Sequence, residues 1–145
     1  VPTLNIGWWY DIFQIGTVRN FQGMQEEGGT AEARDGSKLL MWAQCHACPA
    51  GTKVGDIEWG STNDVDLNAL YVRWFDRWLK GVRNGIDEEP PVRLFVMGAN
   101  EWRGEWEWPL ARTQWTDLYL QPGGGLASAR DARMPPCSIS MSPSA

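Results

Sequence analysis

Residues 66–81 have the sequence DLNALYVRWFDRWLKG. Apolar side chains recur along this stretch at intervals of three and four residues, which is the period of an α-helix with one apolar face. They are Leu67, Leu70, Tyr71, Trp74, Phe75, Trp78 and Leu79. We predict a helix from about Asp66 to Lys80 that ends at Gly81, since glycine is favoured just after a helix. Burying these side chains would contribute on the order of 10–20 kcal/mol, at about 1.5–3 kcal/mol each, so the helix should pack against a large surface.

The sequence before this helix predicts an alternation of strand and helix. Short apolar runs at residues 2–7 and 37–41 indicate two buried strands. Between them, residues 17–27 indicate a helix with Thr17 as its cap, and the two glycines that follow would end it.

The sequence after the long helix changes in character. Glu88-Glu89-Pro90-Pro91 interrupts the helical pattern and indicates a linker or a domain boundary. Beyond it, residues 92–98 and 116–120 alternate apolar and polar side chains, as strands do.

This order of elements predicts an α/β fold followed by the opening strands of a β domain. We place the α/β part at residues 1–88, the start of the β part at 89–120 and a mobile tail at 121–145. Neither part holds enough strands to close a doubly wound sheet or a sandwich by itself.

Charge and hydropathy exclude two classes of partner. The 145-residue chain has a formal net charge of −5, whereas binding to a phosphate backbone needs a basic stripe. The sequence contains no run of 18 apolar residues, so no segment is expected to span a membrane. We therefore expect neither a nucleic-acid partner nor a membrane partner.

Tryptophan is unusually frequent, with ten in the chain. Tryptophan rings can pack in a core, or they can form a platform on which sugars and other flat ligands stack. Residues 102–108, WRGEWEW, are the most suggestive run for stacking, although an irregular strand or bulged loop is the plainer interpretation. A non-catalytic, tryptophan-rich module that binds a glycan or a protein therefore stays open as an alternative function.

An acid and the chain's single histidine each follow a predicted strand. Asp11 comes after the first strand and His46 after the second. Sites in open α/β sheets form outside the carboxyl ends of the strands, and an imidazole held by a carboxylate is suited to general base catalysis. The other interpretation is an unrelated loop aspartate and a surface histidine.

Cys45 and Cys48 form a C-x-x-C motif around His46. Such a motif can be a redox pair or half of a zinc site. Zinc needs about four ligands, and only Cys137 could join the local three. We therefore expect neither a metal nor a cofactor, and three cysteines are too few for a disulfide framework.

Four segments resemble the CocE/NonD hydrolases, a family of serine esterases, acylases and relatives of Xaa-Pro dipeptidyl-peptidase. The first is PTLNIG at residues 2–7 with WYD at 9–11, and the second is KLLM at 38–41 with His46, VGD at 54–56 and WG at 59–60. The third is RWFDRWLKG at 73–81, and the last is PPVRLFVMGAN at 90–100 with WR at 102–103 and WPLA at 108–111.

The resemblance implies the C-terminal part of an α/β-hydrolase domain followed by the start of a β-sandwich of the jelly-roll type. It implies a Ser-His-Asp triad in which Asp11 orients His46, acting on a small acyl ester, amide or peptide substrate. The family's chain order places the serine upstream of Val1, and no serine of this chain is flanked by glycine at −2 and +2. We therefore expect this chain to be inactive by itself.

Three further expectations follow from the resemblance. Phe13 matches an aromatic side chain that lines the acyl pocket in some members, so it is a candidate substrate-binding residue, with core packing as the other interpretation. Many members self-associate, which suggests a homo-oligomer. Two positions depart from the family pattern: Trp8 stands where a second glycine is usual, and Trp42-Ala43-Gln44-Cys45 stands where Gly-Pro-Trp and one further residue precede the histidine.

Overall fold

The computed structural model describes residues 1–48, 51–121 and 123–129. By its internal contacts the chain divides into two compact units, residues 1–111 and 112–145, and each is described by itself.

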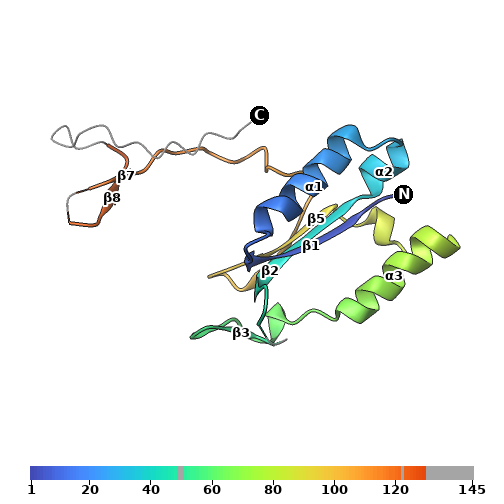
Figure 1. The fold of residues 1–145 in the computed structure, drawn as a ribbon, viewed down its shortest axis with the longest axis horizontal. Coiled ribbons are helices and arrows are strands. Elements are labelled where there is room, and N and C mark those ends of the chain that lie inside the picture. Colours follow the sequence, from blue (N-terminus) through green and yellow to red (C-terminus); the bar gives the residue numbers. More distant parts are fainter. Residues whose placement is uncertain (49–50, 122, 130–145) are drawn as a thin grey trace. The chain divides into compact units, whose positions relative to one another are not determined.

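The first unit is built on a mixed four-stranded sheet (Figure 1). Its strands are β1 (Leu4–Tyr10), β2 (Lys38–Cys45), β5 (Val92–Val96) and β6 (Glu101–Glu105), in the order β1-β2-β5-β6. The pairs β1–β2 and β2–β5 are parallel, and β6 is antiparallel to β5. The strands β1, β2 and β5 therefore share one carboxyl end.

Helices cover both faces of this sheet. Figure 1 shows α1 (Gln14–Glu27) and α2 (Ala31–Gly36) on one side and α3 (Leu67–Lys80) on the other. Along β2, Leu39 and Met41 pack in the cluster that contains Phe21 of α1, whereas Leu40 and Trp42 pack in the cluster that α3 joins. This alternation follows from the strand period of two, and it explains why β2 is apolar almost without interruption.

The strands and helices that the sequence predicted are present with corrected bounds. The first two strands run three and four residues further than predicted, to Tyr10 and Cys45, because the aromatic-rich stretches after them also pair in the sheet. Helix α1 begins at Gln14, so Thr17 is not its cap but lies inside it. The short helix α2 was not predicted; its cap is Thr30, whose side chain accepts a hydrogen bond from the Ala33 N–H.

Helix α3 has the predicted bounds. Asp66 caps its first turn by accepting a hydrogen bond from the Ala69 N–H at 2.9 Å, and Gly81 ends it in the left-handed conformation. The predicted burial of its apolar stripe holds only in part: Trp74 is buried, whereas Tyr71, Phe75 and Leu79 are exposed. Within the described residues, the sheet covers one side of this stripe.

The segment from Gly81 to Pro91 is anchored to α3. Arg73 pairs with Glu89 at 2.6 Å, and Arg77 pairs with Asp87 at 2.8 Å. The hydrogen bond from Arg77 holds the pKa of the Asp87 carboxyl below its ordinary value. The boundary predicted at residues 88–89 lies at the end of the 3₁₀ turn η2 (Ile86–Glu88), and β5 beyond it continues the sheet. The division of the chain into domains therefore stays a prediction.

Short elements complete the description. The hairpin of β3 (Lys53–Val54) and β4 (Ile57–Glu58) and the 3₁₀ turn η1 (Ser61–Asn63) lead from β2 to α3. In the second unit, β7 (Tyr119–Leu120) pairs with β8 (Leu126–Ala127). Most of the tail predicted to be mobile, including Cys137, lies outside the described residues.

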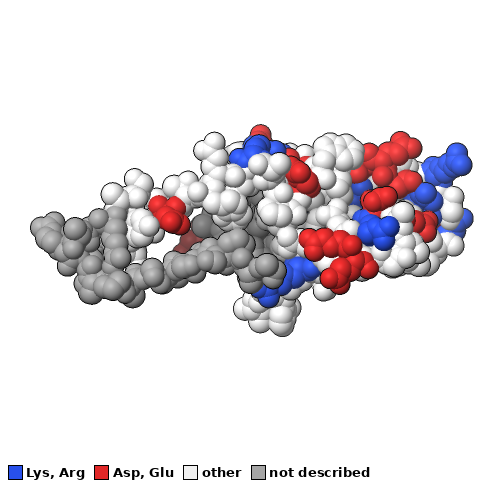
Figure 2. Space-filling view, turned by 90° about the horizontal axis from the view of Figure 1, so that it is seen from above, with Lys and Arg blue, Asp and Glu red and all other residues white. Residues whose placement is uncertain are grey.

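The surface carries both signs of charge. On the face drawn in Figure 2, acidic and basic side chains lie close to one another over the described residues. None of the helices in the described ranges has the length and apolar content that a bilayer crossing requires.

Candidate active site

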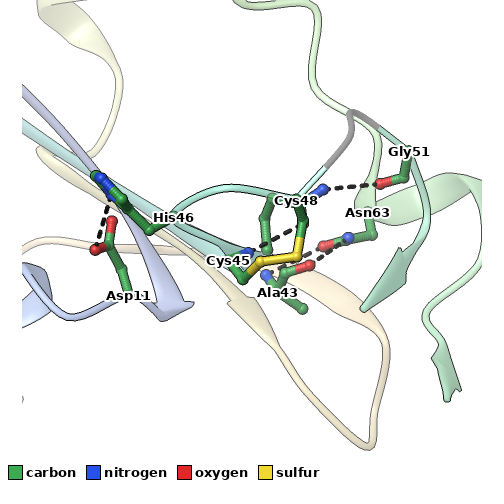
Figure 3. Close-up of a disulfide and its surroundings, with 8 residues drawn as sticks. Asp11, Ala43, Cys45, His46, Cys48, Gly51 and Asn63 are labelled. Carbon is green, nitrogen blue, oxygen red and sulfur yellow. Dashed lines mark hydrogen bonds and ion pairs between the residues drawn. A yellow bond between two sulfur atoms is a disulfide. The ribbon is translucent and has the colours of Figure 1, made fainter. Parts of the chain in front are cut away.

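Strand register brings Asp11 and His46 together. Tyr10 of β1 is paired with Cys45 of β2, and Asp11 and His46 are the residues that follow them. The His46 Nδ1 lies 3.2 Å from the Asp11 Oδ1 (Figure 3). The two residues that the sequence singled out are thus neighbours at the carboxyl end of the sheet, and their catalytic role is a prediction taken up below.

A β-bulge in β2 places His46 opposite Asp11. Trp8 pairs with Trp42 and Tyr10 with Cys45, so β2 advances by three residues where β1 advances by two. Without the extra residue in β2, Cys45 would lie opposite Asp11, and His46 would lie one residue too far along the strand. Bulges commonly re-aim side chains in this way. The bulge falls within residues 42–45, where the sequence departs from the family pattern.

Asn63 holds the bulge from outside the sheet. Its fully buried amide accepts a hydrogen bond from the Ala43 N–H at 3.2 Å and donates one to the Ala43 carbonyl at 2.7 Å. Figure 3 shows this pair of contacts beside the end of β2. The side chain of Asn63 thus satisfies the backbone groups of Ala43 as a neighbouring strand would. Sequence reasoning missed Asn63, because a single asparagine in a turn-rich stretch carries no signal of its own.

Asp11 is fixed by its own turn. Its side chain is only 4% exposed, and its Oδ1 accepts a hydrogen bond from the Phe13 N–H at 2.8 Å as well as lying against His46. The Asp11 carbonyl also accepts a hydrogen bond from the N–H of Gln14, where α1 begins. The start of the helix therefore holds the Asp11 carboxylate in one orientation independently of its contact with the imidazole.

His46 is open to solvent on its other side. Its side chain is 49% exposed. The ring of Phe13 packs edge-on against it with centroids 4.8 Å apart, and the ring of Trp8 lies 6.2 Å away. If Nδ1–H is donated to Asp11, the lone pair of Nε2 is left free, which is the tautomer that general base catalysis uses.

Phe13 and Trp8 lie beside the pair in different settings. Phe13 is 58% exposed, so it borders the site rather than packing in the core. Trp8 is half-buried and packs edge-on against Trp42 with centroids 5.6 Å apart. The indole thus lies beside the imidazole at a position where the resemblance leads us to expect a glycine.

Cys45 and Cys48 are joined by a disulfide. Their sulfurs are therefore not free to bind zinc while the bond is intact. Among the described residues, no group of three or more histidine, cysteine, aspartate or glutamate side chains is arranged to hold a metal ion. Cys137 lies outside those residues.

The opposite end of the sheet holds a separate cavity of about 300 Å³, whose lining includes Leu4, Lys38 and Val92 near the starts of their strands. Neither Asp11 nor His46 lines this cavity. Lys38 is buried, and its ammonium donates hydrogen bonds to the carbonyls of Glu89 and Pro90. Burial lowers the pKa of Lys38 below its ordinary value.

Comparison with known protein families places the second half of the chain. The family described as the X-Pro dipeptidyl-peptidase C-terminal non-catalytic domain matches residues 84–138. The described part of that region contains the strands β5 to β8, and it begins well after Asp11 and His46.

Comparison with individual proteins covers more of the chain. The chain is 33% identical over 126 residues to cocaine esterase of Rhodococcus sp. (strain MB1 Bresler). This alignment covers 85% of the chain and 21% of the relative. Proteins of Mycobacterium bovis and Mycobacterium tuberculosis, each named as an inferred serine esterase, are 29% identical over 111 residues, which are 70% of this chain and 17% of theirs. The chain thus spans about a fifth of the length of these relatives.

Proposed function

We propose that this chain belongs to the CocE/NonD family of hydrolases and that it is a C-terminal part of a serine hydrolase for small acyl esters, amides or peptides. The observation that carries the proposal is the pair of Asp11 and His46, which lie 3.2 Å apart at the carboxyl ends of two adjacent parallel strands. The esterase names of the relatives support the same reaction class.

The proposed mechanism assigns one task to each residue. The Nε2 of His46 takes the proton of a serine hydroxyl as that oxygen attacks the acyl carbon, and it then gives the proton to the leaving group. Asp11 accepts the Nδ1–H bond, fixes the tautomer and stabilises the imidazolium that forms. The serine and the oxyanion donors would come from a part of the protein outside this chain, because the chain has no Gly-x-Ser-x-Gly motif.

Phe13 is proposed to line the acyl pocket. Its exposed ring contacts the imidazole edge-on, which puts an apolar surface next to the reacting atoms. Ile12, which is 78% exposed, would extend that surface. An apolar wall here favours the acyl part of a substrate over water.

The two-part architecture is proposed as well. Residues 1–88 would be the last part of an α/β-hydrolase domain and residues 89–120 the first strands of a jelly-roll. The parallel β1–β2 pair supports the first assignment, and the family match that begins at residue 84 supports the second.

The alternative, a non-catalytic module that binds a glycan or a protein through tryptophan, is not favoured. Trp42, Trp59 and Trp74 are buried in the core, where rings serve packing. Trp106 and Trp115 are exposed and lie in the region that matches a non-catalytic domain, but the relatives that align with most of the chain are named as esterases.

The proposal is tested with the chain joined to its upstream coding sequence and assayed on a chromogenic acyl ester. His46→Ala should lower kcat about 10⁴-fold with little change in KM, since removal of one member of a triad typically lowers kcat by several orders of magnitude. Asp11→Asn should also lower kcat strongly, because the amide no longer enforces the tautomer. Turnover that is unchanged in His46→Ala would refute the assignment.

A further inference from the structure

We propose that the Cys45–Cys48 disulfide is a reducible clamp that positions His46 against Asp11. The clamp consists of residues 45–48 and the bond between the two sulfurs. Its catalytic meaning rests on the function proposed above, but its effect on the geometry of His46 can be measured without any activity.

The first argument is connectivity. Cys45 is the last residue of β2 and is paired with Tyr10, so it is fixed by the sheet. His46 comes next, inside the four-residue loop that the disulfide closes. In Figure 3 the disulfide lies beside the end of β2 while the imidazole reaches toward Asp11. The bond thus ties the far end of the loop back to the sheet and limits the directions that His46 can take.

The second argument is that few other contacts from the described part of the chain hold the loop. The turn itself has a long hydrogen bond from the Cys48 N–H to the Cys45 carbonyl, at 3.5 Å. Beyond it the side chain of His46 relies on Asp11 and on the rings of Phe13 and Trp8, and half of it faces solvent. Opening the disulfide would return backbone freedom to residues 46–48.

The third argument is access. Cys45 and Cys48 are only partly buried, and the two residues between them are exposed. A small dithiol can therefore reach the bond. One of its thiolates attacks a cysteine sulfur, the sulfur–sulfur bond breaks, and its second thiol resolves the mixed disulfide. Cys45 and Cys48 gain two electrons and two protons to become thiols, and the dithiol is oxidised to its own disulfide.

The experiment uses the 145-residue chain labelled uniformly with stable isotopes of nitrogen and carbon, in which His46 is the single histidine and gives one set of ring signals. In the oxidised chain we expect a nuclear Overhauser effect between the rings of His46 and Phe13, whose centroids are 4.8 Å apart. The ring nitrogen shifts should report the tautomer with a proton on Nδ1. Dithiothreitol should weaken the ring contact and shift both nitrogen signals, while amide signals from the core of β2 stay in place.

Variants make the result specific. The double variant Cys45→Ser, Cys48→Ser should give the reduced-type spectrum with or without dithiothreitol. The matched control Cys137→Ser should respond to dithiothreitol as the original chain does. Alkylation followed by mass measurement should count two more reactive thiols after reduction. The proposal fails if those two thiols react without reduction, or if the ring contact and nitrogen shifts are the same in both redox states.

A second readout separates this proposal from the proposed function. In the longer protein, reduction should lower kcat by about 10- to 100-fold with a smaller change in KM, as expected when a catalytic group is misplaced by about 1 Å. An unchanged kcat in the reduced protein would overturn the positioning role while leaving the triad intact. Conversely, if His46→Ala retains full turnover, the proposed function fails, and the spectroscopic test of the clamp still decides the geometry.

Discussion

The two ends of the sheet are held together in different ways. At the carboxyl end, specific polar contacts and a covalent bond position the residues: Asp11 lies against His46, Asn63 hydrogen-bonds to Ala43, and a disulfide closes the turn after β2. At the amino end, Gly36 packs tightly against Pro2 and Trp78, and the Lys38 ammonium donates hydrogen bonds to backbone carbonyls beside the cavity of about 300 Å³.

This difference matches what each end must do. The carboxyl end leaves Tyr10, Ile12 and Phe13 exposed around a half-exposed histidine, so it is open to a further part of the protein or to a substrate. The amino end holds a cavity of about 300 Å³, which neither Asp11 nor His46 lines. Substitutions at the carboxyl end should therefore disturb geometry and stability together, whereas those at the amino end should disturb stability alone.

The largest effect on stability is expected from Asn63→Ala. This change leaves the buried N–H and carbonyl of Ala43 without their partners, and each unsatisfied group costs about 1–3 kcal/mol, so the free energy of unfolding should fall by about 2–6 kcal/mol. Urea unfolding followed by tryptophan fluorescence measures this loss. The ring contact between His46 and Phe13 should weaken as well, because the bulge sets the register of His46.

The matched control is Asn68→Ala, since Asn68 is exposed on α3. It should change the free energy of unfolding by less than about 0.5 kcal/mol. If Asn63→Ala were as mild as Asn68→Ala, the bulge would hold its shape without the asparagine, and the contrast between the two ends would lose its main support.

These contacts also mark where sequence reasoning succeeded and where it stopped. The period and the cap residues of α3 predicted its bounds, because they are local properties of the sequence. The position of Asp11 and His46 after two strands predicted their meeting, because parallel strands share a carboxyl end.

The bulge, Asn63 and the clamp could not be predicted in the same way. A one-residue bulge inside an apolar strand leaves no trace in the pattern of residues 42–45. The role of Asn63 depends on a contact across 20 residues of sequence. Two cysteines three apart are compatible with a disulfide, a redox pair or a metal site, so only the fold distinguishes between them. The exposed half of the α3 stripe was missed because periodicity identifies an apolar face but not what covers it.

A smaller effect is expected at the amino end from Gly36→Ala. A Cβ at this position would lie 2.7 Å from the Pro2 Cγ and 2.8 Å from the Trp78 Cη2, and neither ring can move aside without shifting its neighbours. Overpacking of this kind costs about 1–3 kcal/mol. Urea unfolding measures the loss, and the histidine ring signals should stay unchanged because the site lies at the other end of the sheet.

The same substitution at Gly23 serves as the control. Gly23 lies inside α1 with nothing within 4 Å of a new Cβ, so Gly23→Ala should stabilise the chain by about 0.5–1 kcal/mol through helix propensity. A lower free energy of unfolding in Gly36→Ala together with a higher one in Gly23→Ala would establish close packing at Gly36. A loss at both positions would instead indicate that the helices tolerate no added side chain, and a shift of the His46 signals in Gly36→Ala would break the proposed independence of the two ends.

The smallest effect should be a pH dependence that comes from Lys38. Burial lowers the pKa of Lys38 in the folded chain below its ordinary value of 10.5, so between these two values the unfolded chain binds more protons than the folded chain. Stability must then rise with pH through this window, because proton release accompanies folding. Lys38→Met removes the titrating group, so the stability of the original chain relative to this variant should increase as the pH approaches 10.5.

Lys53→Met is the matched control, because Lys53 is an exposed lysine of β3. Unfolding free energies of the three proteins, compared at the same series of pH values, isolate the contribution of Lys38 from that of every other group. A flat difference between the original chain and Lys38→Met would mean that the attraction of the Glu89 and Asp87 carboxylates fully offsets the effect of burial on the pKa of Lys38. The distinction between the two ends of the sheet would then reduce to the packing around Gly36.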